Sequence, residues 1–230
     1  MQDILTKLNA IAIDGPVASG KTVVGSLLAN QLEWHFLDTG SMYRGITWAA
    51  LNKHIDLNDH KRLTELAYET NIEPVSSQTG IRLLIDKNDV TDKLRSPEVE
   101  SVVSIIAKIA SLRVALVEKQ RGLGRKGKIV MIGRDIGTVV LPDAILKIFL
   151  TASIETRATR RHTELVTSGR NITYHNVLED LLKRDRIDTE RLHSPLKYAA
   201  DSIDVNTDQL TIQDTINKIL SLLRNSANSI

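Results

Sequence analysis

The sequence predicts an α/β fold in which helices flank a parallel sheet. Short apolar runs, typical of buried strands, alternate along the 230 residues with longer segments of helical periodicity. Several of these runs end directly at glycine or charged residues, as expected where parallel strands present their carboxyl ends to a ligand. With 42% hydrophobic and 25% charged residues, the chain has the composition of one globular domain.

The first part of the chain is expected to begin the sheet. Apolar runs end at Asp14 and Asp38, and each is followed by a segment with apolar residues at helical spacing. Thr39 is a candidate N-cap for the second of these helices. The expected elements are a strand at 10–14, a helix at 22–32, a strand at 34–38, and helices at 40–52 and 63–69.

The pattern changes between residues 71 and 94. This stretch consists of short strand-like pieces joined by polar turns such as SSQTG, which predicts a small antiparallel insertion. Ser96-Pro97 then begins a helical region, with proline at the first helical position, and residues 105–120 continue it. The remaining elements are strands at 128–132, 145–150 and 202–205 and helices at 155–167, 176–191 and 211–223.

The segment AIDGPVASGKTVV, residues 12–24, matches the spacing G-x-x-x-x-G-K-[ST] between an expected strand and an expected helix. Small residues let backbone N–H groups approach phosphate oxygens, and the helix N-terminus favours anions. Lys21 can bring a positive charge to the β- and γ-phosphates, and the Thr22 hydroxyl can bind Mg²⁺. The loop therefore predicts a P-loop NTPase-type fold and ATP binding by Gly15, Pro16, Val17, Ala18, Ser19, Gly20, Lys21 and Thr22.

The rest of the sequence indicates phosphoryl transfer rather than a GTP-driven switch. It has no N-K-x-D motif, and the expected strand KIVMI runs into Gly133-Arg134-Asp135 instead of a plain Walker B aspartate. Arginines cluster at expected strand ends and on late helices, where they could hold a second phosphate and stabilise charge on the transferred group. Taken alone, the clusters RATRRHTE and KRDRIDTER could also be solvated helix faces.

Four segments resemble those of bacterial-type cytidylate kinases, a family of nucleoside monophosphate kinases. They are IAIDGPVASGKT, LDTGSMYR, IGRDIGTVVLPDA and KRDRIDTERLHSPL, in the family's order. The resemblance extends from Ile11 to about Ile219, and GRDIGTVVLPDA is its most specific part. It implies transfer of the γ-phosphoryl group of ATP to CMP or dCMP, with Mg²⁺, giving ADP and CDP or dCDP. It also implies that the insertion extends the monophosphate-binding region and that a helical lid closes over the phosphates.

The resemblance further implies roles for individual residues. Lys21, Arg134, Arg157 and Arg161 would act in phosphoryl transfer, the last two from the lid. A carboxylate can accept from the cytosine amine while arginine or serine donates to the other base atoms. The expected CMP site comprises Arg44, Arg134 and Arg191 for the phosphate, Ser104, Arg113 and Asp135 for the cytosine edge, Arg184 and Asp188 for the sugar, and Thr39 and Tyr43 beside them.

Two positions depart from the pattern of many family members. Thr22 follows Lys21 directly, where many members have glycine, and this leaves the magnesium hydroxyl in its general P-loop position. Thr39 replaces a serine, and its added methyl group could alter packing near the sugar or phosphate. The adenine contacts stay open, with the loop Asn206-Thr207-Asp208 after the last strand as one candidate.

We expect one kinase unit made of a core, an insertion and a lid. The core would comprise about residues 1–62, 95–152 and 172–230, the monophosphate-binding insertion about residues 63–94, and the lid about residues 153–171.

Composition limits the expected partners and location. The formal net charge is +2 and no basic-aromatic stripe is visible, so no nucleic-acid partner is expected. The sequence contains 0 cysteines, which excludes disulfides and fits a reducing compartment. No uncharged apolar run reaches the roughly 18 residues that a membrane-spanning helix needs. We therefore expect a cytoplasmic monomer that binds ATP and CMP or dCMP and no membrane.

Two alternatives stay open. A P-loop kinase for another small acceptor, such as UMP or a shikimate-like acid, would not need Asp135 as a cytosine acceptor. An ATP-regulated RNA-binding module belongs to a different functional class, and the modest net charge argues against it.

Overall fold

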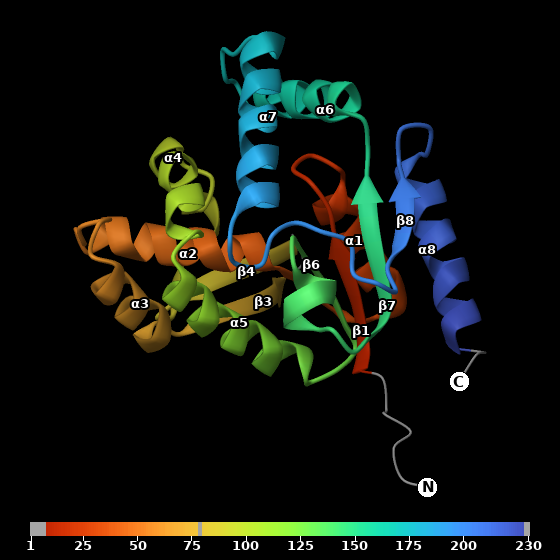
Figure 1. The fold of residues 1–230 in the computed structure, drawn as a ribbon, viewed down its shortest axis with the longest axis horizontal. Coiled ribbons are helices and arrows are strands. Elements are labelled where there is room, and N and C mark those ends of the chain that lie inside the picture. Colours follow the sequence, from red (N-terminus) through yellow and green to blue (C-terminus); the bar gives the residue numbers. More distant parts are fainter. Residues whose placement is uncertain (1–7, 78–79, 228–230) are drawn as a thin grey trace, which may run out of the picture.

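The computed structural model describes residues 8–77 and 80–227, so residues 1–7 of the expected core and residues 78–79 of the expected SSQTG turn lie outside it. A five-stranded parallel sheet with the order β2-β6-β1-β7-β8 forms its centre (Figure 1). The strands are β1 (Leu8–Asp14), β2 (His35–Asp38), β6 (Ile129–Gly133), β7 (Ala144–Thr151) and β8 (Ile203–Asn206). The predicted parallel sheet is confirmed.

Helices cover both faces of this sheet because side chains alternate along each strand. Ile11 and Ile13 of β1 pack in a cluster with α1 and α8, whereas Ala10 and Ala12 belong to a cluster with α2, α3 and α5. These helices are α1 (Lys21–Leu32), α2 (Thr39–Asn52), α3 (His60–Glu69), α5 (Ala110–Gly124) and α8 (Ile212–Ala227).

A separate three-stranded antiparallel sheet follows α3, as predicted from the change of pattern. It comprises β3 (Ile72–Ser77), β4 (Gly80–Ile85) and β5 (Asn88–Asp89). Leu83 and Ile85 of β4 pack closely on α2 at Gly45. A Cβ added to this glycine would lie only 2.9 Å from each of the two side chains. A single 3-10 turn, η1 (Thr91–Lys93), then leads to α4.

The expected continuous helical region after Ser96 is two helices, so this part of the prediction is wrong. α4 (Pro97–Ile106) begins with Pro97 at its first turn, as predicted, and Ser96 is its N-cap. The chain then leaves the helical conformation at Ile109 before α5 begins. The Arg113 side chain donates to the carbonyl of Ala107 at 3.2 Å, which stabilises the break. The break brings the end of α4 and the start of α5 to one side of the cavity described below.

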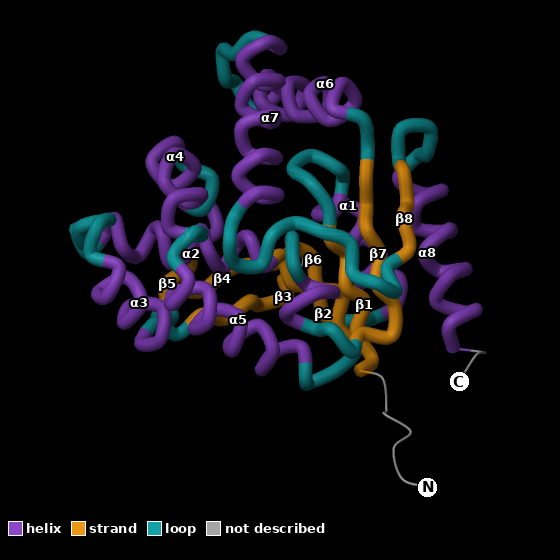
Figure 2. The backbone as a smooth tube through the Cα atoms, viewed as in Figure 1, coloured by secondary structure: helices purple, strands orange, loops and turns teal. Residues whose placement is uncertain are grey.

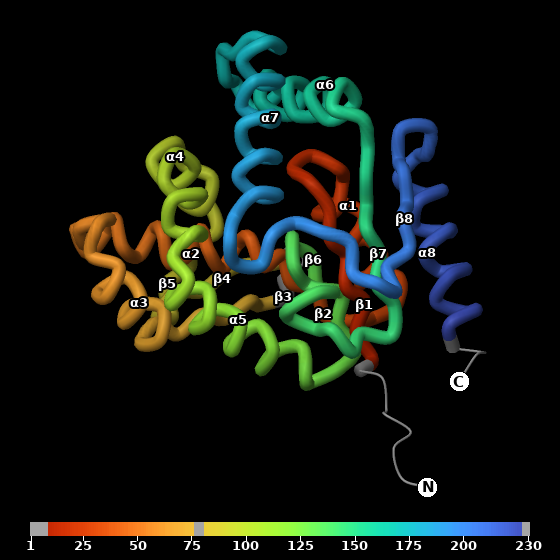
Figure 3. The backbone as a smooth tube through the Cα atoms, in the orientation of Figure 1, coloured from red at the N-terminus to blue at the C-terminus, as the bar shows by residue number. Residues whose placement is uncertain are grey.

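A helical hairpin lies above the carboxyl ends of the strands (Figures 1 and 3). It consists of α6 (Ile154–Thr167) and α7 (Tyr174–Glu190). Ala158 and Leu165 of α6 pack against Val177 and Leu181 of α7, and the tip of the loop between β1 and α1 packs on the same cluster. Figure 2 shows that loop beneath the hairpin. These contacts place the expected lid over the expected phosphate-binding loop.

No helix within the described residues is long and apolar enough to cross a membrane.

Candidate active site

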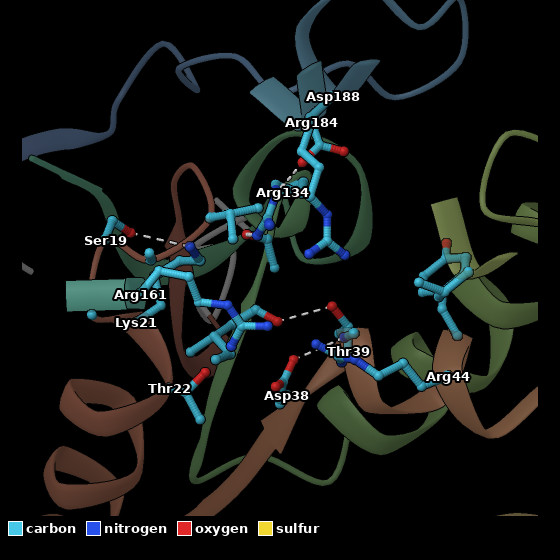
Figure 4. A pocket seen from close by; sticks show the side chains of 18 of the residues that line it. Ser19, Lys21, Thr22, Asp38, Thr39, Arg44, Arg134, Arg161, Arg184 and Asp188 are labelled. Carbon is cyan, nitrogen blue, oxygen red and sulfur yellow. Dashed lines mark hydrogen bonds and ion pairs between the residues drawn. The ribbon is translucent and has the colours of Figure 1, made fainter. Parts of the chain in front are cut away.

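A cavity of about 580 Å³ opens between the carboxyl ends of the strands, the helical hairpin and α4. The P-loop forms one end of its wall with residues Val17 to Thr22. Figure 4 shows Lys21, Arg44, Arg134, Arg161 and Arg184 arranged around this shared space. The cavity wall also contains every residue expected in the CMP site: Thr39, Tyr43, Arg44, Ser104, Arg113, Arg134, Asp135, Arg184, Asp188 and Arg191.

The two P-loop glycines are needed for different reasons. Gly15 has φ 151°, and a Cβ there would collide with the carbonyl oxygen of Leu150 on β7. Gly20 is the N-cap of α1 with φ 94°, a left-handed conformation that glycine adopts without strain, and its surroundings are open. Gly15 therefore serves the close approach of loop and sheet. Gly15 and Pro16 stand behind the cavity wall, unlike the rest of the expected ATP-binding loop.

Lys21 is buried, and its ammonium turns back onto its own loop. Its Nζ donates to the carbonyl of Pro16 at 2.5 Å and to Ser19 Oγ at 3.1 Å. Burial lowers the pKa of Lys21, and the nearby charge of Arg134 acts in the same direction. Both oxygens that satisfy this ammonium are neutral, so an anionic oxygen in the cavity would be a stronger acceptor.

The start of α2 is tied to the end of β6. The Thr39 hydroxyl donates to the carbonyl of Ile132 at 2.9 Å, and the carboxylate of Asp38 caps α2 by accepting from the Gly40 N–H at 2.9 Å. Serine would offer the same hydroxyl, so the expected difference at Thr39 leaves this contact intact. Asp38 and Gly40 both line the cavity. The sequence placed Asp38 at a strand end on the ligand side but assigned neither residue to the site.

An unexpected π-helical turn, η2 (Ile136–Val140), follows β6 and carries Arg134 and Asp135 at its entrance. Asp14, at the end of β1, accepts from the backbone N–H groups of Ile136 and Gly137 at 2.8 Å each. Burial raises the pKa of Asp14 to about 6, although these two hydrogen bonds act to lower it. Asp14 therefore fixes the turn that presents Arg134 and Asp135 to the cavity.

Asp135 lies at a deep polar corner of the cavity and is 6% exposed. Its carboxylate accepts from Arg113 Nη2 at 2.6 Å and lies 3.8 Å from Arg191 Nη2. The guanidinium of Arg113 also lies over the ring of Tyr43, 5.3 Å from its centroid. Burial raises the pKa of Tyr43 to about 12, so its hydroxyl stays protonated at neutral pH.

This corner contains buried polar atoms that lack hydrogen-bond partners. They are the Tyr43 hydroxyl, Arg113 Nε and Arg191 Nη2, half of the six such side-chain atoms found among the described residues. Burying an unsatisfied polar group costs about 1–3 kcal/mol, so a concentration of them marks a place where a polar ligand would bind.

Arg134 is aimed into the cavity by Asp188. Its Nε donates to the Asp188 carboxylate at 2.7 Å. Burial acts to lower the pKa of Arg134, but the charge and hydrogen bond of Asp188 together with the charges of Asp38 and Asp14 outweigh it, and the pKa is raised. The same carboxylate lies 3.9 Å from Arg191 Nη1. Asp188, expected at the sugar, thus lines the cavity with its carboxylate already held by arginines.

Arg44, Arg161 and Arg184 surround a residue that the sequence did not single out, Glu100 of α4. A glutamate on an amphipathic helix is typical of a solvated face, and no motif contains it. Its position four residues before Ser104 is the one available signal, because residues at that spacing share a helix face.

Arg157, expected to act beside the phosphates, is not among the side chains that line the cavity. Its guanidinium forms a two-pronged ion pair with Asp185, at 3.1 and 2.7 Å, and also donates to the carbonyls of Val17 and Ala152. Arg157 therefore ties α6 to α7 and to the P-loop. Spacing could not separate it from Arg161, which lies four residues on and does line the cavity.

The end of the cavity near α8 combines polar and apolar groups. Arg160 donates to the Thr207 hydroxyl at 3.0 Å and to the Thr207 carbonyl at 2.9 Å. Leu210 and Ile212 lie beside them on the wall. Of the candidate loop Asn206-Thr207-Asp208, only Thr207 lines the cavity, while Asp208 accepts from the N–H of Ser153.

The chain is similar in sequence to one known family of proteins. The sequence profile of the cytidylate kinase family matches residues 11–225. A cytidylate kinase of Bacillus subtilis (strain 168) is 44% identical over 216 residues, which cover 94% of this chain and 96% of that protein. A cytidylate kinase of Bacillus velezensis is 45% identical over 219 residues, covering 95% and 98%.

Among solved structures, an uncharacterized protein from Eubacterium ventriosum matches with a TM-score of 0.51 at 13% identity, over 95% of this chain and 99% of that one. This match shows a shared fold alone. The family profile and the curated relatives span nearly the whole sequence, and the chain therefore belongs to the cytidylate kinase family.

Proposed function

We propose that the protein transfers the γ-phosphoryl group of ATP to CMP or dCMP, forming ADP and CDP or dCDP. The observation that carries this proposal is that one cavity has a P-loop at one end and a deep polar corner at the other. Lys21, Arg44, Arg134, Arg161 and Arg184 lie around the space between these ends, where the phosphates of two nucleotides would meet.

The P-loop side would bind ATP. Backbone N–H groups at the start of α1 and the Lys21 ammonium would hold the β- and γ-phosphates. Arg160 and the apolar side chains of Leu210 and Ile212 would border the adenine, since they offer a cation and flat apolar surface at the same end.

The site also fits Mg²⁺. Thr22 follows Lys21 at the first turn of α1, and it lines the cavity, so its hydroxyl could ligate the ion. Among the described residues, no group of three or more histidine, cysteine, aspartate or glutamate side chains could hold a metal ion. Proteins commonly hold Mg²⁺ through few side chains together with substrate phosphates, so the hydroxyl of Thr22 fits this role. The ion would neutralise charge on the phosphates during transfer.

The polar corner would bind the acceptor. Arg44, Arg134 and Arg191 would hold the CMP phosphate, and Asp135 would accept from the cytosine amine. Ser104 and Arg113 would donate to the remaining base atoms, and the buried atoms of Tyr43, Arg113 and Arg191 that lack a hydrogen bond support a polar ligand here. Arg184 and Asp188 would face the sugar. Thr39, at the start of α2, would lie beside the bound CMP.

Transfer would proceed in line. A CMP phosphate oxygen forms a bond to the γ-phosphorus while the bond from that phosphorus to the β–γ bridging oxygen breaks, so ADP leaves with the electron pair. The protein contributes position and positive charge: Lys21 and Arg134 would contact the transferred group, and Arg161 would approach it from the lid. The lid, about residues 153–171 in our proposal, would exclude water that could otherwise hydrolyse ATP.

We further propose that the protein acts as a monomer in the cytoplasm, a reducing compartment that its cysteine-free sequence fits. The low net charge of +2 supports small anionic substrates rather than nucleic acid as partners.

A coupled assay of ADP formation with ATP and each of CMP, dCMP, UMP and AMP tests the proposal. We expect turnover with CMP or dCMP and much lower turnover with AMP. Rates at background with both cytidine nucleotides would contradict it. Turnover with UMP alone would favour the alternative acceptor.

A further inference from the structure

Glu100 carries the densest set of charge contacts in the cavity. Its side chain is 15% exposed, and its Oε1 accepts a hydrogen bond from Arg44 Nε at 3.2 Å. Its Oε2 lies 3.6 Å from Arg161 Nη2 and 3.5 Å from Arg184 Nη1. One carboxylate on α4 therefore faces guanidinium groups from α2, α6 and α7.

Three guanidinium groups that converge on one point repel each other unless a negative charge lies among them. In the protein without nucleotides, Glu100 provides that charge. Burial alone would raise the pKa of Glu100, but the charges of Arg44, Arg184 and Arg161 outweigh it, and the pKa is lowered. The carboxylate is therefore ionised at neutral pH.

The three contacts differ in kind. The bond to Arg44 uses Nε, so both terminal nitrogens of that guanidinium stay available for a phosphate. The contacts to Arg161 and Arg184 are at or beyond the limit of a hydrogen bond, and they involve terminal nitrogens. Phosphate oxygens could therefore replace Glu100 at Arg161 and Arg184 while Arg44 stays oriented.

Another set of contacts joins the same parts of the protein. Arg95, just before α4, pairs with Glu164 of α6 at 2.9 Å, and Arg170 donates to the carbonyl of Arg95 at 3.0 Å. The side chains of Arg95 and Glu164 are about half exposed, and exposed ion pairs contribute little. Glu164 also pairs with Arg161 at 2.9 Å, so Glu100 is the more buried of the two carboxylates that contact this lid arginine.

We propose that Glu100 is a positioning residue that gathers Arg44, Arg161 and Arg184 before substrates bind and yields Arg161 and Arg184 to phosphate groups afterwards. This role rests on the proposed function, because the phosphates would be those of CMP and ATP. Glu100 acts through the arginines and makes no bond to the transferred group. Its negative charge also opposes incoming phosphate, so it lowers the affinity for CMP while it keeps the arginines in place.

The Glu100→Gln variant separates charge from hydrogen bonding, since the amide oxygen can still accept from Arg44. Removing one charge on the order of 7 Å from a bound phosphate, partly screened by water, should tighten CMP binding about three- to tenfold. Calorimetry without ATP measures this, with cytidine as the comparison ligand. We expect unchanged affinity for cytidine, which has no phosphate. Glu98→Gln is the matched control, because Glu98 is exposed on the same helix and lies off the cavity wall.

A second variant tests orientation. Glu100→Ala removes the acceptor for Arg44 as well as the charge, so we expect weaker CMP binding than in Glu100→Gln. Equal CMP affinities in the two variants would overturn the positioning role. Unchanged or weaker CMP binding in Glu100→Gln, at an unchanged unfolding temperature, would overturn the charge effect.

Tripolyphosphate separates the role of Glu100 from the proposed function, since it needs only the P-loop and the arginines. Tighter tripolyphosphate binding in Glu100→Gln than in the wild type supports the inference, whether or not these two proteins bind CMP. Failure of both proteins to bind CMP would contradict the proposed function instead. Unchanged tripolyphosphate affinity would overturn the inference.

Discussion

Replacing Asp135 with asparagine tests the corner that we assign to cytosine. The substitution keeps the shape of the side chain, removes its charge, and places an NH₂ donor where a second acceptor oxygen stood. Asp135 is 6% exposed and accepts from Arg113, which is 4% exposed, at 2.6 Å. The change therefore affects both the stability of the corner and the base that it can bind.

The expected loss of stability follows from burial. Removing one partner of a buried ion pair commonly costs about 3–5 kcal/mol. Asparagine retains one oxygen for Arg113, but Arg191 Nη2, 3.8 Å from the carboxylate, loses its negative neighbour. We expect the free energy of unfolding to fall by about 2–4 kcal/mol, in the lower part of that range.

The substitution should also change the preference for CMP over UMP. A carboxylate accepts from the cytosine amine, whereas the asparagine NH₂ can donate to the corresponding uracil oxygen. Each good base-edge contact contributes about 1–3 kcal/mol of discrimination, so the ratio of kcat/KM for CMP over UMP should fall about 10- to 100-fold.

Steady-state assays with CMP and UMP at saturating ATP measure this ratio, and urea unfolding measures the stability. Asp143→Asn is the matched control, since Asp143 is exposed and outside the cavity wall. Equal losses of kcat/KM for CMP and UMP, or a loss confined to the KM for ATP, would refute the assignment of Asp135 to the base.

Three further changes address other parts of the site. Lys21→Met should lower turnover about 10²- to 10³-fold in the coupled assay while CMP binding without ATP changes little, and normal turnover would contradict its place at the phosphates. Burial raises the pKa of Asp14 from 3.8 to about 6, so the folded state holds this proton more tightly than the unfolded chain and loses stability as Asp14 ionises. The unfolding free energy of the wild type minus that of Asp14→Asn should thus fall by about 3 kcal/mol between about pH 3 and about pH 7, and a pH-independent difference would show that the pKa is not raised. Arg157→Ala leaves the Asp185 carboxylate without its guanidinium partner, so the free energy of unfolding measured in urea should fall by about 3 kcal/mol. Arg160→Ala should lower it less, because its partner Thr207 is neutral. Similar losses of unfolding free energy in the two variants would count against the structural role of Arg157.

The sequence predicted the sheet and most of the helices because local rules governed those segments. Ile11 and Ile13 alternate with Ala10 and Ala12 on a strand buried on both faces, and Pro97 marks the first turn of α4. The break between α4 and α5 was missed because residues 105–120 keep helical apolar spacing. A contact from the Arg113 side chain to the Ala107 carbonyl accompanies that break, and such a contact within the folded chain has no local signature.

The candidate site divides in the same way. Motifs identified the P-loop and the strand-end residues Arg134 and Asp135, because their spacing is set by the chain itself. Whether an arginine on α6 faces the cavity depends on how α6 packs against α7, so Arg157 and Arg161 looked equivalent in the sequence. Glu100 was missed because its arginine neighbours lie on three other helices, so its contacts and its burial arise only when the fold is assembled.

The central claim is that one cavity holds two nucleotides with their phosphates facing each other among fixed positive charges. A dinucleotide in which five phosphates link adenosine to cytidine tests it most directly, with its inhibition measured against each substrate in turn. We expect it to compete with both ATP and CMP and to bind more tightly than either one. Competition with ATP alone, at an affinity no better than that of ATP, would contradict the claim.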